Sequence, residues 1–88
     1  MNWVCELTDD AKEDLISLPK TTQKRVARVL EQMQLDPFHG DVKALHGDEW
    51  KGVFRRRLGD YRILFVPDWG HRMVRIMRIV IRSGKTYR

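Results

Sequence analysis

Arginine residues are concentrated in one stretch of the chain, from Trp50 to Val66. Arg55, Arg57 and Arg62 lie there among apolar residues, in the order W-K-G-V-F-R-R-R-L-G-D-Y-R-I-L-F-V. A guanidinium group stays charged and binds a phosphate through two parallel N–H donors. The residue types therefore favour binding of a polyanion, either a nucleic acid or an acidic protein surface.

This stretch is expected to form a β-hairpin. Its residues alternate with the period of two that is typical of strands, which places Arg55 and Arg57 on one face of the first segment. Gly59 and Asp60 supply a tight turn before Arg62 begins the second segment. Which of the three arginines converge depends on the strand register, and the sequence leaves that open.

Net positive charge is confined to the second half of the chain. From Met1 to Glu49 there are six Lys and Arg against ten Asp and Glu, which is a net charge of −4. From Trp50 to Arg88 there are eleven against two, a net charge of +9. A polyanionic partner and a merely solvated sheet face explain this composition equally well. Only a shared face for the arginines would favour nucleic acid.

The length of 88 residues predicts a single domain over residues 1–88. The longest apolar stretches, Ile63–Val66 and Ile79–Ile81, are far too short to cross a bilayer. Because the N-terminus also has no basic segment followed by an apolar run, we expect a soluble cytoplasmic protein. The single cysteine, Cys5, is expected to be a small buried apolar residue rather than a nucleophile.

The first half of the chain predicts one strand and two helices. Residues 2–7 alternate as a strand, and Thr8 is a typical N-cap with two aspartates after it. The first helix is expected to run to about Leu18, where Pro19 ends it. The second is expected from residue 20 or 21 to Leu35, so that the two form an antiparallel helical hairpin.

The second half predicts further strands. Residues 38–49 read as an irregular link before the arginine hairpin, residues 67–71 as a turn and residues 72–82 as a third extended segment. Residues 83–88 form a polar, basic tail. The predicted fold is α+β, with the helical hairpin on one face of a four-stranded, mostly antiparallel sheet. The other face is left for water or a partner.

The whole chain resembles the RelE/ParE superfamily of toxins from bacterial and archaeal type II toxin-antitoxin systems. Residues 42–47, V-K-A-L-H-G, are similar to the K-x-L-x-G of the family. The stretch from Arg55 to Phe65 is similar to its R-x-R-x-G-D-Y-R-x-L-F, and a terminal strand then leads into Arg82 and Tyr87-Arg88. The order and spacing of these segments make the resemblance specific.

The resemblance implies one of two activities. Toxins of the RelE branch enter the ribosomal A site and cleave messenger RNA, whereas those of the ParE branch inhibit DNA gyrase and are not nucleases. In both branches a cognate antitoxin protein neutralises the toxin. We predict a ribosome-dependent mRNA endoribonuclease that inhibits translation and needs no metal or other cofactor. A gyrase inhibitor performs no chemistry on RNA and would not need the arginines and the tyrosine of these segments together.

A third alternative is an inactive, toxin-like binding module. Two departures from the family pattern favour it. Ile81 stands where relatives often have a histidine, and the spacing from Arg82 to Tyr87 is one residue longer than in many of them.

The resemblance also implies the site residues. The expected catalytic residues are Arg55, Arg57, Arg62, Arg82 and Tyr87. Further candidates for RNA binding are Lys43, Lys51, Lys85 and Arg88.

Metal-free RNA cleavage uses the ribose 2′-OH as nucleophile and requires a proton acceptor, a proton donor and stabilisation of charge on the phosphoryl oxygens. Arginine suits only the last role, because its pKa lies so far above neutral pH that it rarely gives up its proton. Tyr87 and Lys85 have ordinary pKa values near ~10 that neighbouring cations lower, so they are the candidates for proton transfer. Tyr87 is also a candidate for stacking on an RNA base.

Other residues of chemically useful type have simpler interpretations. The three histidines lack metal-ligand spacing, so no metal site is expected. Core packing is favoured over base stacking for Trp3 and Trp50, whereas Trp69 lies in a turn and is open to either exposure or a contact. Glu49 and Asp60 are the acids next to the hairpin, and Asp60 is expected to form its turn.

Three more arginines, Arg72, Arg75 and Arg78, lie on the last predicted strand. A spacing of three residues alternates between the faces of a strand, so they are not expected to share one face. Solvation or binding to the acids of an antitoxin is favoured over catalysis for these residues.

Overall fold

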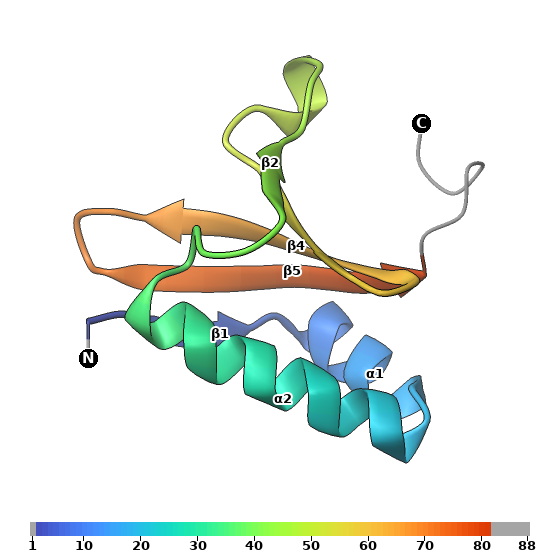
Figure 1. Cartoon of the computed structure of the whole chain (residues 1–88). Helices are drawn as coiled ribbons and strands as arrows, with labels where there is room; N and C mark the ends of the chain where they lie inside the picture. Colours follow the sequence, from blue (N-terminus) through green and yellow to red (C-terminus); the bar gives the residue numbers. More distant parts are fainter. Residues whose placement is uncertain (1, 82–88) are drawn as a thin grey trace.

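The computed structural model describes residues 2–81 and shows two helices packed on one sheet (Figure 1). In chain order the elements are β1 (Val4–Leu7), α1 (Asp9–Ser17), α2 (Lys20–Leu35), β2 (Val42–Ala44), the 3₁₀ turn η1 (Asp48–Trp50), β3 (Phe54–Leu58), β4 (Tyr61–Asp68) and β5 (Met73–Ile81). The predicted α+β class is confirmed. The site candidates outside the described residues are Arg82, Lys85, Tyr87 and Arg88.

The strands form one sheet in the order β1-β5-β4-β3-β2, in which the β1–β5 pairing is parallel and the others are antiparallel. The sheet has five strands rather than the predicted four, because Val42–Ala44 of the expected irregular link pairs with β3. A strand of three residues is too short to show alternation in the sequence. The turn between β3 and β4 forms as predicted, with Gly59 at a φ of 59°.

Local signals determine where the helices begin and end. The Thr8 side chain accepts a hydrogen bond from the backbone N–H of Ala11 at 3.1 Å, which is the cap that its residue type predicts. Pro19 separates α1 from α2, because a proline disfavours helical backbone in the residue before it and is tolerated at a helix start. The predicted helix boundaries are confirmed to within one residue.

The hydrophobic core lies between the two helices and one face of the sheet. Its buried apolar residues are Trp3, Ala11, Val26, Val29, Met33, Ile63, Phe65, Val74, Ile76 and Ile79. Cys5 is half-buried beside them and donates a weak hydrogen bond to the carbonyl of Leu30. Burial raises the pKa of the Cys5 thiol, so this residue packs as an apolar side chain, as expected.

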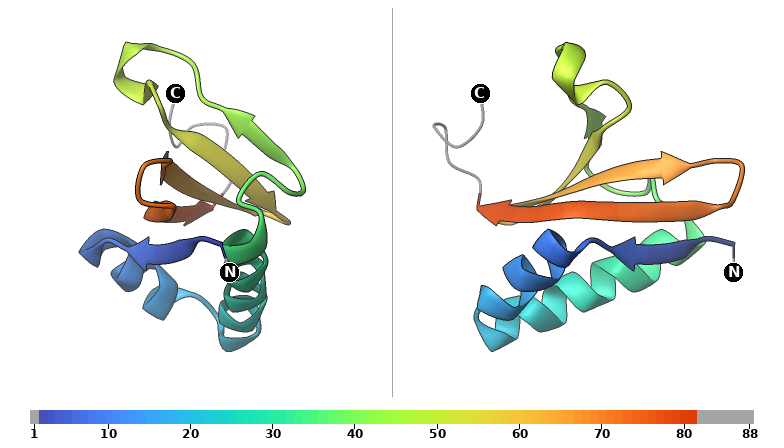
Figure 2. Two further views of the ribbon diagram at one scale, coloured as in Figure 1. Left: turned by 90° about the vertical axis from the view of Figure 1, so that its left-hand side faces the viewer. Right: turned by 180° about the vertical axis from the view of Figure 1, so that it is seen from behind.

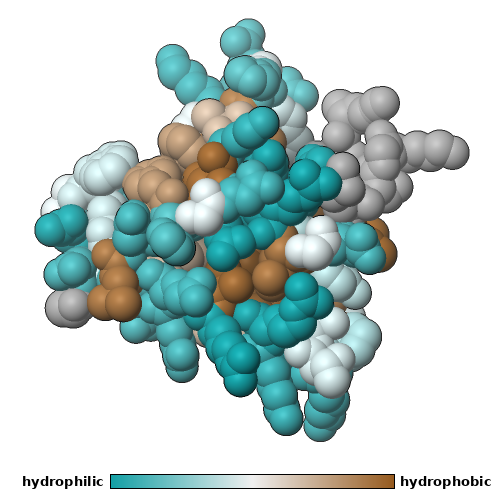
Figure 3. All heavy atoms as spheres, in the orientation of Figure 1, coloured by the Kyte–Doolittle hydropathy of each residue, from teal (hydrophilic) through white to brown (hydrophobic). Residues whose placement is uncertain are grey.

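Both helices lie on the same side of the sheet, and the segment that contains β2 and η1 rises on the other side (Figure 2). Hydrophilic side chains cover most of the face seen in Figure 3, and apolar atoms show through where α2 lies against the sheet. No helix within residues 2–81 is long and apolar enough to cross a membrane. Among residues 2–81, the sheet face opposite α1 and α2 is the one that β2 and η1 border, and we call it the face without helices.

A β-bulge interrupts the pairing of β4 with β5. Leu64 is opposite Arg78, but the next residue, Phe65, is opposite Ile76, so Met77 is an extra residue on β5. Its carbonyl oxygen accepts a hydrogen bond of 2.9 Å from the Thr8 hydroxyl. The same threonine thus caps α1 and ties that helix to the bulge.

Candidate functional site

The strand register brings the arginines of the hairpin together. Arg57 is directly opposite Arg62, and Arg55 is opposite Lys43. Opposite residues in an antiparallel pair point to the same face of a sheet. Because Ile63, the neighbour of Arg62, is buried in the core, these four cationic residues lie on the face without helices. We call them the cationic row.

Asp41 organises one end of the cationic row. Its carboxylate lies 3.1 Å from Nη1 of Arg55 and 4.0 Å from Nη1 of Arg57. Its backbone carbonyl also accepts hydrogen bonds from the Arg55 guanidinium, at 3.1 Å, and from the Arg57 N–H, at 3.0 Å. The hydrogen bond from Arg55 and the charges of nearby Arg57 and Lys43 hold the pKa of Asp41 below its ordinary value, against the opposing effect of desolvation.

Members of the row differ in how open they are to solvent. The Arg55 side chain is only 10% exposed, whereas that of Arg57 is 37% exposed. Arg62 is half-buried, and Lys43 is exposed. Lys51, which directly follows η1 and is not a member of the row, is also exposed. Arg57 and Arg62 are therefore better placed than Arg55 to contact an external phosphate.

Arg56, between two members of the row, points to the opposite face. A Cβ atom built on Gly40 would lie 2.9 Å from its guanidinium, so a larger residue there would have to displace the end of the Arg56 side chain. Gly40 also has a φ of 91°, a conformation that L side chains rarely adopt. The alternation predicted for this strand is therefore confirmed.

A pocket of about 400 Å³ opens on the same face as the cationic row. Its apolar walls are Trp50, Val53, Leu64, Met77 and Val80, and its polar residues are Glu49 and Arg78. We call it the η1 pocket. Val80 is directly opposite Arg62, and Leu64 is directly opposite Arg55. The pocket and the cationic row are therefore adjacent parts of one surface.

The three arginines near β5 contact residues of the chain itself. Arg72 lies over the ring of Trp3, with its guanidinium carbon 5.3 Å from the ring centroid. Arg75 lies 3.8 Å from the exposed carboxylate of Glu6. Arg75 and Arg78 share the face without helices, contrary to the prediction from their spacing, because the bulge inserts one residue between them.

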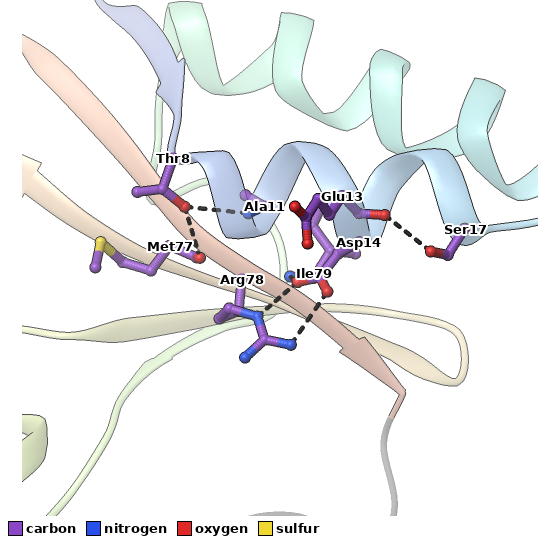
Figure 4. Close-up of polar contacts among 8 residues, drawn as sticks. All are labelled: Thr8, Ala11, Glu13, Asp14, Ser17, Met77, Arg78 and Ile79. Atoms are coloured by element: carbon purple, nitrogen blue, oxygen red, sulfur yellow. Dashed lines mark hydrogen bonds and ion pairs between the residues drawn. The ribbon is translucent and has the colours of Figure 1, made fainter.

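Asp14 of α1 binds both Arg78 and the backbone of β5 (Figure 4). Its carboxylate accepts hydrogen bonds from Nε and Nη2 of Arg78, at 2.7 and 3.1 Å, and from the N–H of Ile79 at 2.9 Å. Burial raises the pKa of Asp14, but these hydrogen bonds and the charge of Arg78 outweigh it and leave the pKa below its ordinary value. The strand β1 pairs with β5 only as far as Ile76, and Asp14 therefore supplies the hydrogen-bond acceptor for the N–H of Ile79 beyond that point.

The tryptophans lie in three different environments. Trp3 is in the core, as predicted. Trp69 is exposed on one side and stacks on Phe38 at 5.3 Å on the other. Trp50 is half-buried in η1 and outside the core cluster, so the prediction of core packing is wrong for it. The sequence around Trp50 has no pattern that distinguishes a core position from a partly exposed one.

The three histidines are exposed loop residues, and His71 makes a contact of 2.9 Å with Asp68. The hydrogen bond from the His71 ring lowers the pKa of Asp68. Within residues 2–81, no three His, Cys, Asp or Glu side chains come together as metal ligands would. Asp41, which the sequence analysis missed, is the acid that contacts the row, and no local pattern could reveal it because the register of β2 places it there.

Comparison with known proteins places the chain in a family. The family described as "ParE toxin of type II toxin-antitoxin system, parDE" matches residues 5–85. A curated relative, the putative toxin RelE1 of Methanocaldococcus jannaschii, is 29% identical over 87 residues, which are 96% of this chain and 94% of that protein.

Solved structures agree with this match. The RelBE2 toxin-antitoxin complex from Mycobacterium tuberculosis has a chain of 28% identity and TM-score 0.83, with 93% of this chain and 100% of that chain covered. The archaeal RelE–RelB complex from Pyrococcus horikoshii matches at 26% identity and TM-score 0.80, with 96% and 99% covered. The isolated E. coli RelE toxin shares the fold, with TM-score 0.77 at 14% identity over 96% of this chain and 88% of that one. The chain therefore belongs to the RelE/ParE superfamily and is a toxin of a type II toxin-antitoxin system.

Proposed function

We propose that this toxin is a ribosome-dependent mRNA endoribonuclease whose cationic row holds the scissile phosphate. The observation that carries the proposal is the register of β3 and β4, which sets Arg57 directly opposite Arg62 on the face without helices. Two guanidinium groups on neighbouring strands offer the paired N–H donors that a phosphoryl group binds. In the transition state the same donors stabilise the charge that develops on the phosphoryl oxygens.

Within this proposal the residues of the site have different roles. Arg57 and Arg62 contact the phosphate, while Arg55 stays bound to Asp41 and adds positive charge beside them. Lys43 and Lys51 are exposed and contact phosphates further along the RNA. Proton transfer is assigned to Tyr87 and Lys85, and Arg82 and Arg88 add positive charge. These four residues lie outside the described residues, and their roles are proposed from the sequence.

We further propose that a cognate antitoxin protein binds this toxin. The similar chains from M. tuberculosis and P. horikoshii were both solved in toxin-antitoxin complexes. A row of cations on a sheet face that no helix among residues 2–81 covers favours an acidic segment as the neutralising partner. Such a segment would exclude RNA by occupying Arg57 and Arg62.

A second candidate function is inhibition of DNA gyrase without nuclease activity. The match to the family described as a ParE toxin favours it. In that case the cationic row is a protein-binding surface, and the phosphate-binding geometry of its arginines has no catalytic use.

One experiment separates the two candidates. The toxin is induced in cells, new 5′-OH ends are mapped on all messages, and the purified toxin is tested in a gyrase supercoiling assay. The endoribonuclease predicts in-frame 5′-OH ends on translated messages and normal supercoiling. Inhibited supercoiling without new RNA ends would establish the second candidate instead. Arg28→Ala, on the exposed side of α2, serves as a control that should behave like the wild type.

A further inference from the structure

We infer that the η1 pocket binds a nucleobase of the RNA whose phosphate lies on the cationic row, with Trp50 as the stacking residue. The inference rests on the proposed function and adds a recognition element to it. It assigns a role to Trp50, which lies outside the core cluster.

The walls of the pocket have the chemistry that a base requires. Trp50 offers an aromatic surface, and base–aromatic stacking is tolerant of base identity because every base has a π-face. Val53 and Leu64 supply the apolar surroundings that exclude water from a flat heterocycle. A volume of about 400 Å³ is in the range of small-molecule sites and leaves room for a purine.

The β-bulge builds the other side of the pocket. Because Met77 is the extra residue, both it and Arg78 line the pocket although they are consecutive in the chain. The guanidinium of Arg78 is bound by Asp14, at 2.7 Å, so its charge is already neutralised. The acceptor oxygens of Glu49 are the remaining polar groups of the lining, and they suit a base edge that offers N–H groups.

The pocket lies at the right place for a base attached to a bound phosphate. Val80 in its wall is directly opposite Arg62, and Cβ atoms of opposite residues are about 5 Å apart. Leu64 lies two residues from Arg62 on the same face of β4, a distance of about 7 Å along the strand. A single nucleotide can therefore place its phosphate on Arg62 and its base in the pocket.

Fluorescence titration tests the inference directly. The full-length Trp69→Phe variant retains Trp50 and the buried Trp3, and guanosine 5′-monophosphate is the probe because guanine offers two adjacent N–H groups. We expect saturable quenching with this probe and none with ribose 5-phosphate, which has the phosphate but no base. The variant with both Trp50→Phe and Trp69→Phe should show no quenching beyond the optical background.

A second measurement links the pocket to cleavage. In cells, Trp50→Ala should reduce the number of 5′-OH ends at least about 5-fold, the loss of one stacked base, and should change the nucleotide preference at the cuts. Trp69→Ala is the matched control, because Trp69 is an exposed tryptophan in the turn after β4 and lies outside the lining of the η1 pocket, so this change should leave both unchanged.

The outcomes distinguish failure of the inference from failure of the proposed function. If the wild type produces 5′-OH ends and Trp50→Ala gives the same number and the same preference, the pocket does not read a base. If the wild type produces none, the endoribonuclease proposal fails, and the titration alone decides: quenching by the nucleotide but not by ribose phosphate supports the pocket. If the nucleotide does not quench the fluorescence of Trp50, the inference is overturned. This holds even if a peptide from the antitoxin quenches Trp50, because the pocket would then bind protein and not a base.

Discussion

The carboxylate of Asp41 lies 3.1 Å from the guanidinium of Arg55, whose side chain is only 10% exposed. Asp41 directly precedes β2, and Arg55 is the second residue of β3. The contact therefore fastens the edge of the sheet and neutralises the most buried charge of the cationic row. Arg57 remains more open beside it.

Replacing Asp41 should destabilise the protein. Asp41→Asn removes the negative charge opposite the buried Arg55 guanidinium, and a buried charge without its partner is costly. We expect a lower midpoint of urea unfolding with an unchanged slope. Glu31→Gln, an exposed acid on α2, is the control and should leave the midpoint in place. Equal midpoints for Asp41→Asn and the wild type would show that the contact is not stabilising.

Acid should weaken the protein through Asp14. The pKa of Asp14 is lower in the folded protein than its unfolded value of about 3.9, so its contribution is fully present above that value. The contribution is lost as the pH falls through the lower folded pKa. Urea midpoints measured from neutral pH downward should drop less steeply for Asp14→Asn than for the wild type. A parallel drop would mean that the contacts with Arg78 and Ile79 do not favour the ionised form.

The Thr8 hydroxyl should contribute to stability in two ways. It accepts from the N–H of Ala11 and donates to the carbonyl of Met77. We expect Thr8→Ala to lower the free energy of unfolding by about 1–2 kcal/mol, measured by urea denaturation. Thr8→Ser keeps the hydroxyl and should retain most of the stability, and Thr21→Ala at an exposed position should have little effect. A serine variant as unstable as the alanine variant would assign the loss to packing of the methyl group.

The cationic row should be essential for RNA cleavage. Removing one preorganised donor from a site that stabilises transition-state charge costs about 100-fold or more in rate, which is the loss expected for Arg57→Ala. Arg57→Lys keeps the charge without the paired donors, so its cleavage rate should lie between those of the wild type and Arg57→Ala. The readout is the frequency of 5′-OH ends in cells that contain equal amounts of folded toxin.

Arg75→Ala is the matched control for the row. Arg75 lies on the same face of the sheet, on β5, where it contacts an exposed glutamate. Cleavage should survive this change. If Arg57→Ala and Arg75→Ala reduced cleavage equally, a diffuse cationic surface rather than the row would be responsible.

The helices, the hairpin turn and the fold class could be predicted from the sequence because their signals are local. Thr8 caps α1 through a residue three positions away, and Pro19 separates the helices by its own backbone geometry. Gly59 fits the turn for the same kind of reason. The resemblance to the toxin superfamily likewise rests on segments whose order is visible in the chain.

The tertiary structure alone decided which charges meet. Register sets Arg57 opposite Arg62, and pairing of β2 brings Asp41 to Arg55, although nothing within either segment specifies its partner on another strand. The bulge at Met77 reversed the expected alternation and formed the wall of the η1 pocket. Contacts between strands depend on packing of the whole core, so a pattern of period two predicts faces but not neighbours.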